Sequence, residues 1–289
     1  MTDGSGEGAT RQERGTLYVV ATPIGNLGDI TLRALEVLRS VAVVAAEDTR
    51  ITRRMWARHD IATPLVSYHA HSDSARSREL VGRLSAGHDV ALVTDAGTPL
   101  VSDPGQDLVG QWVAAGGTVV PIPGPSAVLA ALVSSGIAAP RWTFEGFLPR
   151  KGRERRERLL RIASDERATV LFEAPGRTAG TLRDLALACG GERKAALCRE
   201  LTKRHEEIRR ATLEALLASV AERPLKGEVT IVVAGAPARA ADVAADPVEA
   251  RNRVAALVAA GMRRSEAARR VAAETGLPRK DLFRPGPAG

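Results

Sequence analysis

The first half of this 289-residue chain alternates short apolar segments with helix-like segments, and this alternation constrains its fold more than any other feature. The segments typical of strands are residues 16–25, 42–50, 89–97 and the start of 118–136. Between them, the apolar residues of 29–41, 72–87 and 105–117 have helical spacing, and a helix of small residues ends 118–136. This order predicts an α/β fold, in which helices cover a parallel sheet. We expect Thr31 or Asp29 to cap the helix at 29–41.

Each strand-like segment ends in a loop rich in glycine, proline and acidic residues. The loops read ATPIGNLGD, AEDTR, TDAGTPLVSDPG and IPGPSA. Open α/β sheets bind ligands at the carboxyl ends of their strands, so four such loops at one sheet edge would line one cleft. Glycine lets the backbone approach a ligand, and proline fixes the loop in advance. We expect Asp95 to anchor its own loop through hydrogen bonds to backbone N–H groups.

The loops also exclude two common nucleotide sites. No G-x-x-x-x-G-K-[ST] pattern is present, and no G-x-G-x-x-G follows the first strand-like segment. The sequence therefore predicts neither a P-loop NTPase nor an ordinary dinucleotide site. Backbone donors and acidic side chains, with little lysine or arginine, favour a ligand that has an adenine-like ring, hydroxyl groups and a positive centre.

A change in composition near residue 140 predicts a domain boundary. In the second half, strand-like segments at 168–173, 194–200 and 228–234 alternate with helical segments at 178–189 and 212–220. The last segment has a helical period broken by Gly261 and Gly276, with Ser265 as the expected cap of a helix at 266–275. It is typical of a small helix-turn-helix-like module. We expect a disordered tail at 1–15, α/β domains at 16–138 and 139–236, a linker at 237–247 and a helical module at 248–289.

Composition narrows the class of partner. The formal net charge is +7 and the isoelectric point is about 10.1, which favours a polyanionic partner such as nucleic acid. Two cysteines predict neither a disulfide framework nor a zinc site and fit a reducing cytoplasm. We see no apolar run of about 18 residues and no secretory signal, and so expect no membrane span.

Seven segments together resemble a known family. They read LYVVATPIGNLGDITLRALEVL, AAEDTR, VALVTDAGTPLVSDPG, VVPIPGPSAVLAALVSSG, FEGFLPRKGRERR, LFEAPGR and RELTKRHEEI, and they span roughly residues 16–236. In order and spacing they are similar to the ribosomal RNA small subunit methyltransferase I family, of the tetrapyrrole-methylase-like class of S-adenosylmethionine (SAM) methyltransferases. The resemblance implies two α/β domains with SAM in the cleft between them, and a homodimer. It also implies methyl transfer to a cytidine 2′-hydroxyl in the decoding region of 16S ribosomal RNA, within the 30S subunit.

The motif positions imply the residues that line the SAM site. They are Pro23, Ala96, Gly97, Thr98, Val101, Ser126 and Ala127, with Phe172 from the second domain. One motif departs from the family pattern. Relatives commonly have ESPHR where this chain has EAPGR, so Gly176 replaces an imidazole, and no role of that histidine is carried over.

Methyl transfer to a hydroxyl needs an in-line approach and a proton acceptor. We identify Asp48 as the candidate base, because it follows a strand end and because the wider class carries an acid in the corresponding loop. The alternative is that Asp48 caps a helix or pairs with Arg50. Glu47 is the second candidate, and since side chains alternate on a strand, only one of these two acids is expected to face the cleft.

A second pair of candidate catalytic residues lies in RELTK. Lys203, with Glu200, is expected to hold a phosphate or to assist the loss of the hydroxyl proton; the alternative is a structural ion pair of Lys203 with Glu206 or Glu207. His69 and His71 have no further ligands near them in the sequence. We therefore predict no metal site and interpret both as loop histidines.

The segment PRKGRERRER predicts an RNA contact, since arginine and lysine bind phosphates. Its candidate residues are Arg150, Lys151, Arg153, Arg155 and Arg156. A solvated helix face is the alternative. The basic C-terminal module is either a second RNA contact or a dimer-stabilising tail, and Phe144 and Phe147 are expected in an interdomain core.

Two other functions compete with RNA methylation. A SAM-dependent methyltransferase of a tetrapyrrole or another small molecule would keep the fold and the cofactor, but it has no evident need for the basic segment. A non-catalytic nucleic-acid-binding protein would not need the intact set of cleft loops. SAM binding would distinguish a methyltransferase from a non-catalytic nucleic-acid-binding protein. RNA binding would distinguish an RNA methyltransferase from one that acts on a small molecule.

Overall fold

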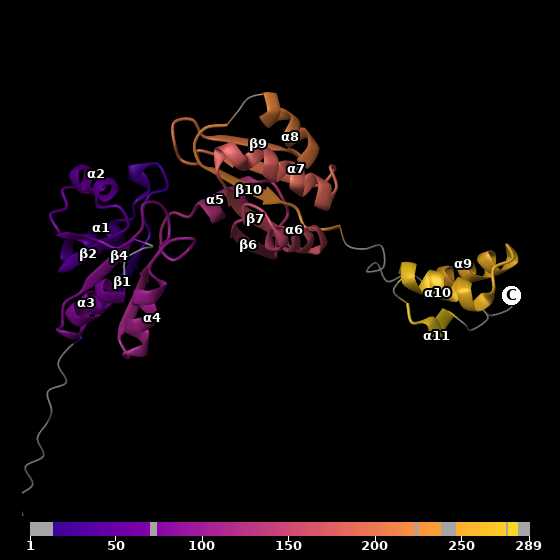
Figure 1. The fold of residues 1–289 in the computed structure, drawn as a ribbon, viewed down its shortest axis with the longest axis horizontal. Helices are drawn as coiled ribbons and strands as arrows, with labels where there is room; N and C mark the ends of the chain where they lie inside the picture. Colours follow the sequence, from indigo (N-terminus) through magenta and orange to yellow (C-terminus); the bar gives the residue numbers. More distant parts are fainter. Residues whose placement is uncertain (1–13, 70–73, 223–224, 238–246, 276, 283–289) are drawn as a thin grey trace, which may run out of the picture.

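The computed structural model describes residues 14–69, 74–222, 225–237, 247–275 and 277–282. The expected tail at 1–15 and linker at 237–247 lie almost entirely outside these ranges. Two five-stranded sheets and a group of C-terminal helices make up the described part of the chain (Figure 1). No helix in these ranges is long and apolar enough to cross a membrane.

The first sheet is parallel throughout, as the sequence predicts. Its strands are β1 (Thr16–Val20), β2 (Val43–Ala46), β3 (Leu65–Ser67), β4 (Val90–Val93) and β5 (Thr118–Ile122). They are ordered β3-β2-β4-β1-β5, and every pair is parallel. Strands β2 and β4 are buried along their whole length, which explains their unbroken apolar sequence.

Helices cover both faces of this sheet because neighbouring strand residues point to opposite sides. Val44 packs in one cluster with Leu38 of α1 (Leu32–Ser40) and Trp56 of α2 (Thr49–His59). Val43 packs on the other face with Leu80 of α3 (Ser74–Ser85) and Trp112 of α4 (Gln106–Ala114). Thr31, one of the two expected caps, accepts a hydrogen bond from the Ala34 N–H at the start of α1.

The second sheet is mixed. Its strands are β6 (Trp142–Phe147), β7 (Ala168–Glu173), β8 (Lys194–Arg199), β9 (Glu207–Thr212) and β10 (Val229–Val233), in the order β6-β7-β10-β8-β9. Only β6 and β7 are parallel within it. Helices α6 (Arg153–Ser164), α7 (Thr178–Cys189) and α8 (Leu213–Glu222) share the core that includes Leu171, Leu197 and Ile231.

Helix α5 (Ala127–Ser134) joins the two halves. It follows β5 of the first sheet, yet its buried Val128 and Ala131 pack against Val170 and Val232 on the second sheet. Ile24, from the loop after β1, belongs to the same cluster. Figure 1 shows α5 lying against β7 and β10. The face of the second sheet that α6–α8 leave open is thus covered by residues that the first half supplies.

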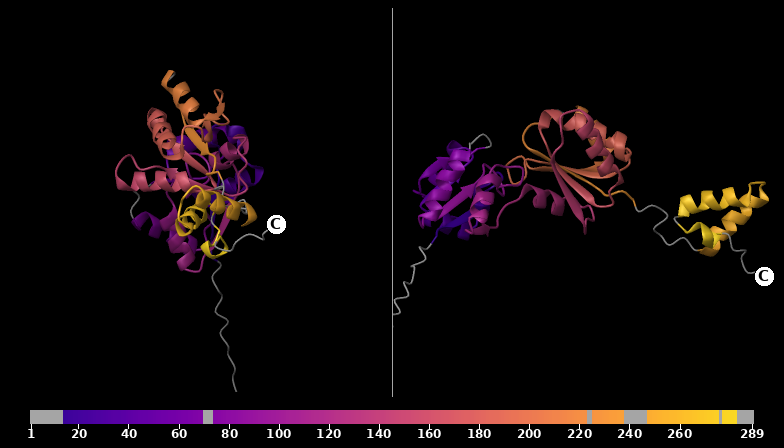
Figure 2. Two further views of the ribbon diagram at one scale, coloured as in Figure 1. Left: turned by 90° about the vertical axis from the view of Figure 1, so that its right-hand side faces the viewer. Right: turned by 60° about the horizontal axis from the view of Figure 1, so that its bottom comes forward.

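The C-terminal helices form a small core of their own. Helices α9 (Pro247–Ala259), α10 (Arg264–Thr275) and α11 (Arg279–Leu282) bury Val254, Val271 and Leu282 against one another. Figures 1 and 2 show them set apart from both sheets. The predicted cap at Ser265 is wrong, because α10 already begins at Arg264 and Ser265 lies inside its first turn.

Candidate functional site

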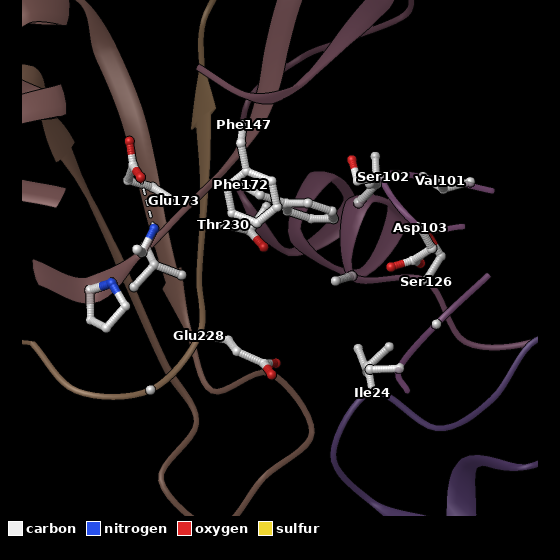
Figure 3. A pocket seen from close by; sticks show the side chains of 18 residues that line it. Ile24, Val101, Ser102, Asp103, Ser126, Phe147, Phe172, Glu173, Glu228 and Thr230 are labelled. Carbon is white, nitrogen blue, oxygen red and sulfur yellow. Dashed lines mark hydrogen bonds between the residues drawn. The ribbon is translucent and has the colours of Figure 1, made fainter. Parts of the chain in front are cut away.

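A cavity of about 490 Å³ lies between the two halves of the molecule. The first half contributes Ile24, residues 96–97, 101–103 and 126–128. The second half contributes Phe147, residues 172–175 and residues 227–230. Figure 3 shows the two walls facing each other, with Asp103 and Ser126 on one side and Phe172, Thr230 and Glu228 on the other. The volume is in the range of small-molecule sites.

The loops after β1 and β4 are joined edge to edge beside the cavity. The Thr22 N–H donates to the Gly97 carbonyl (2.8 Å), and the Gly97 N–H donates to the Thr22 carbonyl (3.0 Å). The buried Thr22 hydroxyl also donates to the Thr94 carbonyl (3.0 Å). Gly97 has a φ of 85°, a conformation that side chains with a Cβ rarely adopt. These bonds fix the backbone of Ala96 and Gly97 as a rigid part of the wall.

The loop after β4 bends back twice before it reaches α4. Leu100 and Ser102 have φ values of 71° and 70°, which are uncommon for residues other than glycine. The second of these turns places Ser102 and Asp103 on the cavity wall. Strained backbone of this kind occurs at functional sites, where the surrounding structure holds it in place.

The start of α5 completes the wall from the first half. Ser126 caps the helix by accepting a hydrogen bond from the Leu129 N–H. The Thr98 hydroxyl donates to the Pro125 carbonyl (3.4 Å) and so links the loop after β4 to the loop after β5. Ser126, Ala127 and Val128 line the cavity at this helix end.

Aromatic rings line the opposite wall. The Phe172 ring meets Phe144 edge-on with centroids 4.9 Å apart, and it meets Phe147 at 5.6 Å. Phe144 packs in the cluster that α5 and Ile24 of the first half form with the second sheet, which confirms its expected place in an interdomain core. The same expectation for Phe147 is wrong, because its side chain is half exposed and lines the cavity. Gly146, with a φ of 61°, and the irregular pairing of β6 turn Phe147 out of the core.

The end of β7 is held by a buried carboxylate. Glu173 accepts hydrogen bonds from the Ala174 N–H (2.8 Å) and the Thr181 hydroxyl (2.6 Å), and it pairs with Arg177. These contacts fix Ala174 and Pro175, which line the cavity. A Cβ on Gly176 would meet no atom within 4 Å, so a small side chain could stand at this position without a clash at its Cβ.

The turn between β8 and β9 places Lys203 beside Glu228, a residue of the cavity wall. The Lys203 ammonium pairs with Glu200 (2.9 Å) and Glu228 (3.1 Å). The expected alternative partners were wrong. Glu206 accepts from the Thr202 N–H, and Glu207 pairs with Arg199 and Arg209. Of these residues only Glu228 lines the cavity.

Six of the eight residues expected to bind the cofactor line this cavity. They are Ala96, Gly97, Val101, Ser126, Ala127 and Phe172. Pro23 and Thr98 do not line it. Pro23 is buried and the next residue, Ile24, takes its place, while the Thr98 hydroxyl is used to join two loops. Residues 102–103 and 227–230 line the cavity without having been predicted.

The Asp48 carboxylate lies at the start of α2 and is not among the residues that line the cavity. It caps the helix by accepting the Arg50 N–H (2.8 Å), and it forms a two-point ion pair with the Arg50 guanidinium. These bonds from Arg50 lower the pKa of Asp48 to about 2. The structure therefore supports the alternative that the sequence left open, a cap paired with Arg50. Such an acidic group is a weak proton acceptor at neutral pH.

Three further carboxylates gather beside the cavity, at the ends of β2 and β4. Glu47 accepts from the Thr94 hydroxyl (2.7 Å), and Asp95 accepts from the Asp48 N–H (2.9 Å). Asp95 thus joins two loops, rather than anchoring its own as expected. Burial raises the pKa of Asp95, and burial together with the charge of Glu47 raises the pKa of Asp103 to about 6. Asp103 is the member of this group that lines the cavity.

The predicted RNA-binding residues differ in exposure. Arg150, Lys151, Arg153 and Arg156 are exposed at the start of α6. Arg155 is not free for RNA, because its side chain is 12% exposed and binds Asp184, the Thr181 hydroxyl and the Pro149 carbonyl. It holds α6 against α7. Arg153 pairs with Glu157 on the helix surface.

No group of three metal-ligating side chains lies close together in the described ranges. His69 is exposed, and His71 lies outside the described residues. Both cysteines are free thiols, with Cys198 buried and Cys189 partly buried. These observations leave the cavity between the sheets as the candidate site.

The chain matches the tetrapyrrole (corrin/porphyrin) methylase family over residues 16–217. It is 47% identical over 269 residues to the ribosomal RNA small subunit methyltransferase I of Synechocystis sp., covering 93% of this chain and 96% of that protein. The Xylella fastidiosa (strain Temecula1) protein of the same name is 46% identical over 271 residues, covering 93% and 98%.

Solved structures share the fold at low sequence identity. The methyltransferase CobJ is 18% identical with a TM-score of 0.59, covering 77% of this chain and 95% of that one. A cobalt precorrin-4 methyltransferase is 16% identical with a TM-score of 0.56, covering 76% and 94%. A uroporphyrin-III C-methyltransferase from Thermus thermophilus, solved with S-adenosylhomocysteine, is 21% identical with a TM-score of 0.53, covering 75% and 97%.

Proposed function

The chain belongs to the tetrapyrrole (corrin/porphyrin) methylase family, and on that premise we propose that it methylates small-subunit ribosomal RNA with SAM as the methyl donor. The acceptor is the ribose 2′-hydroxyl of a cytidine in the decoding region. The observation that carries the proposal is the cavity between the sheets, which contains six of the eight residues expected to bind SAM. The names of close relatives point to the same RNA.

The cavity residues fit the parts of SAM. Phe147 and Phe172 offer aromatic surface to an adenine ring, and Val101 and Ile24 offer apolar surface beside it. The Ala96–Gly97 backbone and the Ser126 hydroxyl are suited to the polar groups of the ligand. The carboxylates of Glu47, Asp95 and Asp103 favour a positively charged ligand over a polyphosphate.

The bound sulfonium supplies an activated methyl group, so the protein's tasks are positioning and proton removal. Rigid walls that hold two reactants in line contribute up to about 7–11 kcal/mol. The paired loops at Thr22 and Gly97, and the cap at Ser126, provide that rigidity. A carboxylate that accepts the hydroxyl proton contributes roughly a further 10²–10⁴-fold in rate.

The surface charge fits an RNA substrate. Arg150, Lys151, Arg153 and Arg156 are exposed a few residues after Phe147, which lines the cavity. The C-terminal helices add a second group of basic residues, namely Arg263, Arg264, Arg269, Arg270, Arg279 and Lys280. Contacts of this kind bind phosphates and give affinity that falls with salt. This feature favours RNA over a tetrapyrrole, which does not require a basic surface of this extent.

The test is methyl transfer from radiolabelled SAM to small ribosomal subunits that lack the modification. We expect label on one cytidine ribose of the decoding region, located by nuclease digestion and chromatography. Naked 16S RNA in parallel tells whether the assembled 30S subunit is required. Absence of label on subunits and RNA, with SAM binding intact in calorimetry, would overturn the RNA assignment and leave a small-molecule acceptor.

The homodimer and the cytoplasmic location belong to the same proposal. Light scattering after size exclusion measures the mass in solution, and we expect twice the 30.5 kDa of one chain. A mass of one chain at micromolar concentration would remove the dimer from the proposal without affecting the chemistry.

A further inference from the structure

Helix α2 separates apolar and basic side chains onto opposite faces. Met55 and Trp56 of the buried face pack in the core on one side of the first sheet. The exposed face carries four arginines, namely Arg50, Arg53, Arg54 and Arg58. At about 100° per residue, these four side chains cover an arc of about 140° opposite the buried residues. The sequence of the helix contains no aspartate or glutamate, so this arginine face has a single sign of charge.

Most of the charge on the arginine face is unpaired. The Arg50 guanidinium pairs with Asp48. Within the described ranges, the side chains of Arg53, Arg54 and Arg58 form no hydrogen bond or ion pair. Like charges four residues apart destabilise a helix, and Arg54 has an arginine at this distance on either side. A surface normally mixes charges of both signs, so an unpaired face of one sign indicates an anionic partner.

Helix α6 is also rich in arginine but neutralises part of its charge. Arg153 pairs with Glu157 four residues further along the helix. Arg158 pairs with Glu154 in the same way (2.9 Å). Helix α2 has no acidic residue that could do this. In the described part of the chain, α2 therefore leaves more of its positive charge open to a partner than its content of arginine alone would suggest.

The start of α2 is joined to the cavity wall. Asp48, which caps the helix, donates its N–H to the Asp95 carboxylate (2.9 Å) in the loop after β4. The next residues of that loop, 96–97, line the cavity. The arginine face begins two residues after this joint and extends over a helix of about 16 Å. Figure 1 shows α2 in the first half and α6 in the second, on either side of the place where the halves meet.

The phosphate groups of an RNA strand fit a face of this kind. A guanidinium group binds phosphate oxygens through paired N–H donors. Phosphates repeat along the strand as the arginines repeat along α2, and such contacts position a nucleic acid without reading its sequence. An RNA whose acceptor ribose enters the cavity must lie across the neighbouring surface, where α2 begins.

We propose that the arginine face of α2 binds the phosphate backbone of the substrate RNA beside the acceptor nucleotide, which rests on the proposed function. Its arginines position the RNA and take no part in the chemistry of methyl transfer. The RNA is then held from both halves of the molecule, by α2 on the first and by the basic residues at the start of α6 on the second.

The test compares the wild type with the triple variant Arg53→Ala/Arg54→Ala/Arg58→Ala in the full-length chain. Affinity for small subunits that lack the modification is measured by filter binding from about 50 to 300 mM salt. We expect the slope of log affinity against log salt to fall by about 2 to 3, at 0.7–0.9 for each lost phosphate contact. At physiological salt, the KM for subunits should rise by about tenfold or more, while kcat and SAM affinity change by less than about threefold.

Thermal melts distinguish this effect from a folding defect. Alanine favours a helix, and the substitutions remove the repulsion between neighbouring arginines. The melting temperature of the triple variant should therefore be unchanged or higher. The variant Arg53→Lys/Arg54→Lys/Arg58→Lys keeps the positive charges, and we expect it to keep most of the salt slope.

Arg183→Ala is the matched control for the single variant Arg54→Ala. Arg183 is exposed on α7 of the second half and, among the described residues, it forms no hydrogen bond or ion pair. Both variants lose one unpaired charge. We expect Arg54→Ala to lower the salt slope by about 0.7–0.9 and Arg183→Ala to leave it unchanged.

The outcomes separate this proposal from the proposed function. A triple alanine variant with the wild-type slope and affinity overturns the role of α2, while methyl transfer by the wild type upholds the RNA assignment. An equal fall for Arg183→Ala and Arg54→Ala also overturns it, because the effect would then be one of net charge. No transfer by the wild type to subunits or 16S RNA, with SAM bound, overturns the proposed function and this role of α2 with it.

Discussion

The Lys203 side chain lies directly over Gly25 and so connects the two walls of the cavity. A Cβ at Gly25 would be 2.3 Å from Lys203 Cγ and 2.8 Å from its Cε. Next to this contact, the Asn26 N–H donates to the Thr202 hydroxyl (3.2 Å). Gly25 follows β1 of the first sheet, and Lys203 belongs to the turn between β8 and β9 of the second. A residue without a side chain is therefore required where the two halves meet.

The first prediction is that Gly25→Ala weakens SAM binding by about tenfold and lowers the melting temperature. The new methyl group displaces Lys203 from Glu200 and Glu228 and forces the two walls apart. Calorimetry and thermal melts measure both effects. Gly82→Ala is the control, because Gly82 is exposed in α3 and its Cβ would meet no atom within 4 Å. There the change stabilises the helix by up to about 1 kcal/mol.

A double-mutant cycle distinguishes this contact from a general loss of stability. Lys203→Ala removes the atoms that the new methyl group would meet, so adding it to Gly25→Ala should restore part of the stability. We expect a coupling of about 0.5–3 kcal/mol, the usual range for residues in contact. Additive effects of the two substitutions would show that the glycine is not required by Lys203.

The second prediction separates the two interpretations of Asp48. If Asp48 serves only as the cap of α2, Asp48→Asn keeps nearly all of the transfer rate, since asparagine caps helices about as well as aspartate. Asp48→Ala loses the cap and lowers the melting temperature, again with the rate per folded molecule unchanged. Because the folded-state pKa is about 2, the ion-pair contribution to stability is present above pH 4 and fades from pH 4 to 2.

Turnover and SAM affinity of these Asp48 variants decide the point. The sequence-based assignment as a base requires that Asp48→Asn lowers turnover by 10²-fold or more while SAM affinity stays within a few-fold. That result would favour Asp48 as the proton acceptor.

The parallel first sheet was predictable because its strands are buried on both faces. Val43–Ala46 and Val90–Val93 are unbroken apolar runs, and that pattern is specific. Helix α2 and strand β9 were not predicted, for a common reason. Both elements carry several arginines, which hide the apolar pattern. In α2, only the helical spacing of Thr52, Met55 and Trp56 reveals that these three residues share a buried face. The antiparallel pairing in the second sheet left no local signal, since strand direction depends on the connections.

The sequence predicted which loops line the candidate site better than it predicted which of their side chains point into it. Glycine and proline mark the segments that approach a ligand, and those segments do line the cavity. Which side chain points inward depends on backbone angles that composition does not reveal. The positive φ of Leu100 and Ser102 turns Asp103 to the wall. Gly227 and Glu228 carried no signal, because they reach the cavity through the pairing of β10 with β7.

The third prediction concerns two arginines on α6 that look alike in the sequence. Arg155→Ala should destabilise the protein by about 2 kcal/mol, because it leaves Asp184 without its ion-pair partner and removes the hydrogen bond to the Thr181 hydroxyl. Arg153→Ala should change stability by less than about 0.5 kcal/mol, since its pair with Glu157 is exposed. Urea unfolding measures both.

We expect Arg153→Ala to lower RNA affinity more than Arg155→Ala does, which is the reverse of their effects on stability. If Arg153 binds a phosphate, its loss lowers the slope of log affinity against log salt by about 0.7–0.9. Filter binding over a salt series measures the slope. An unchanged slope for Arg153→Ala, Arg156→Ala and Lys151→Ala would assign the exposed face of α6 to solvent, while Arg155→Ala should leave the slope unchanged in either case.

The fourth prediction is that Asp103→Asn raises the stability of the protein at neutral pH. The pKa of Asp103 is raised to about 6 by burial in the folded state, whereas an unfolded aspartate titrates near 3.8. Between these values the folded state binds more protons than the unfolded state, so the wild type loses stability as the pH rises from 4 to 6. The asparagine variant has no such loss.

The advantage of Asp103→Asn in melting temperature should therefore be small at pH 4, grow up to pH 6 and stay constant above it. A gain that is independent of pH would show that burial of the charge does not destabilise the folded protein. A gain that grows over this range would show that a charged Asp103 lowers the stability of the folded protein at neutral pH, because burial disfavours the ionised carboxylate.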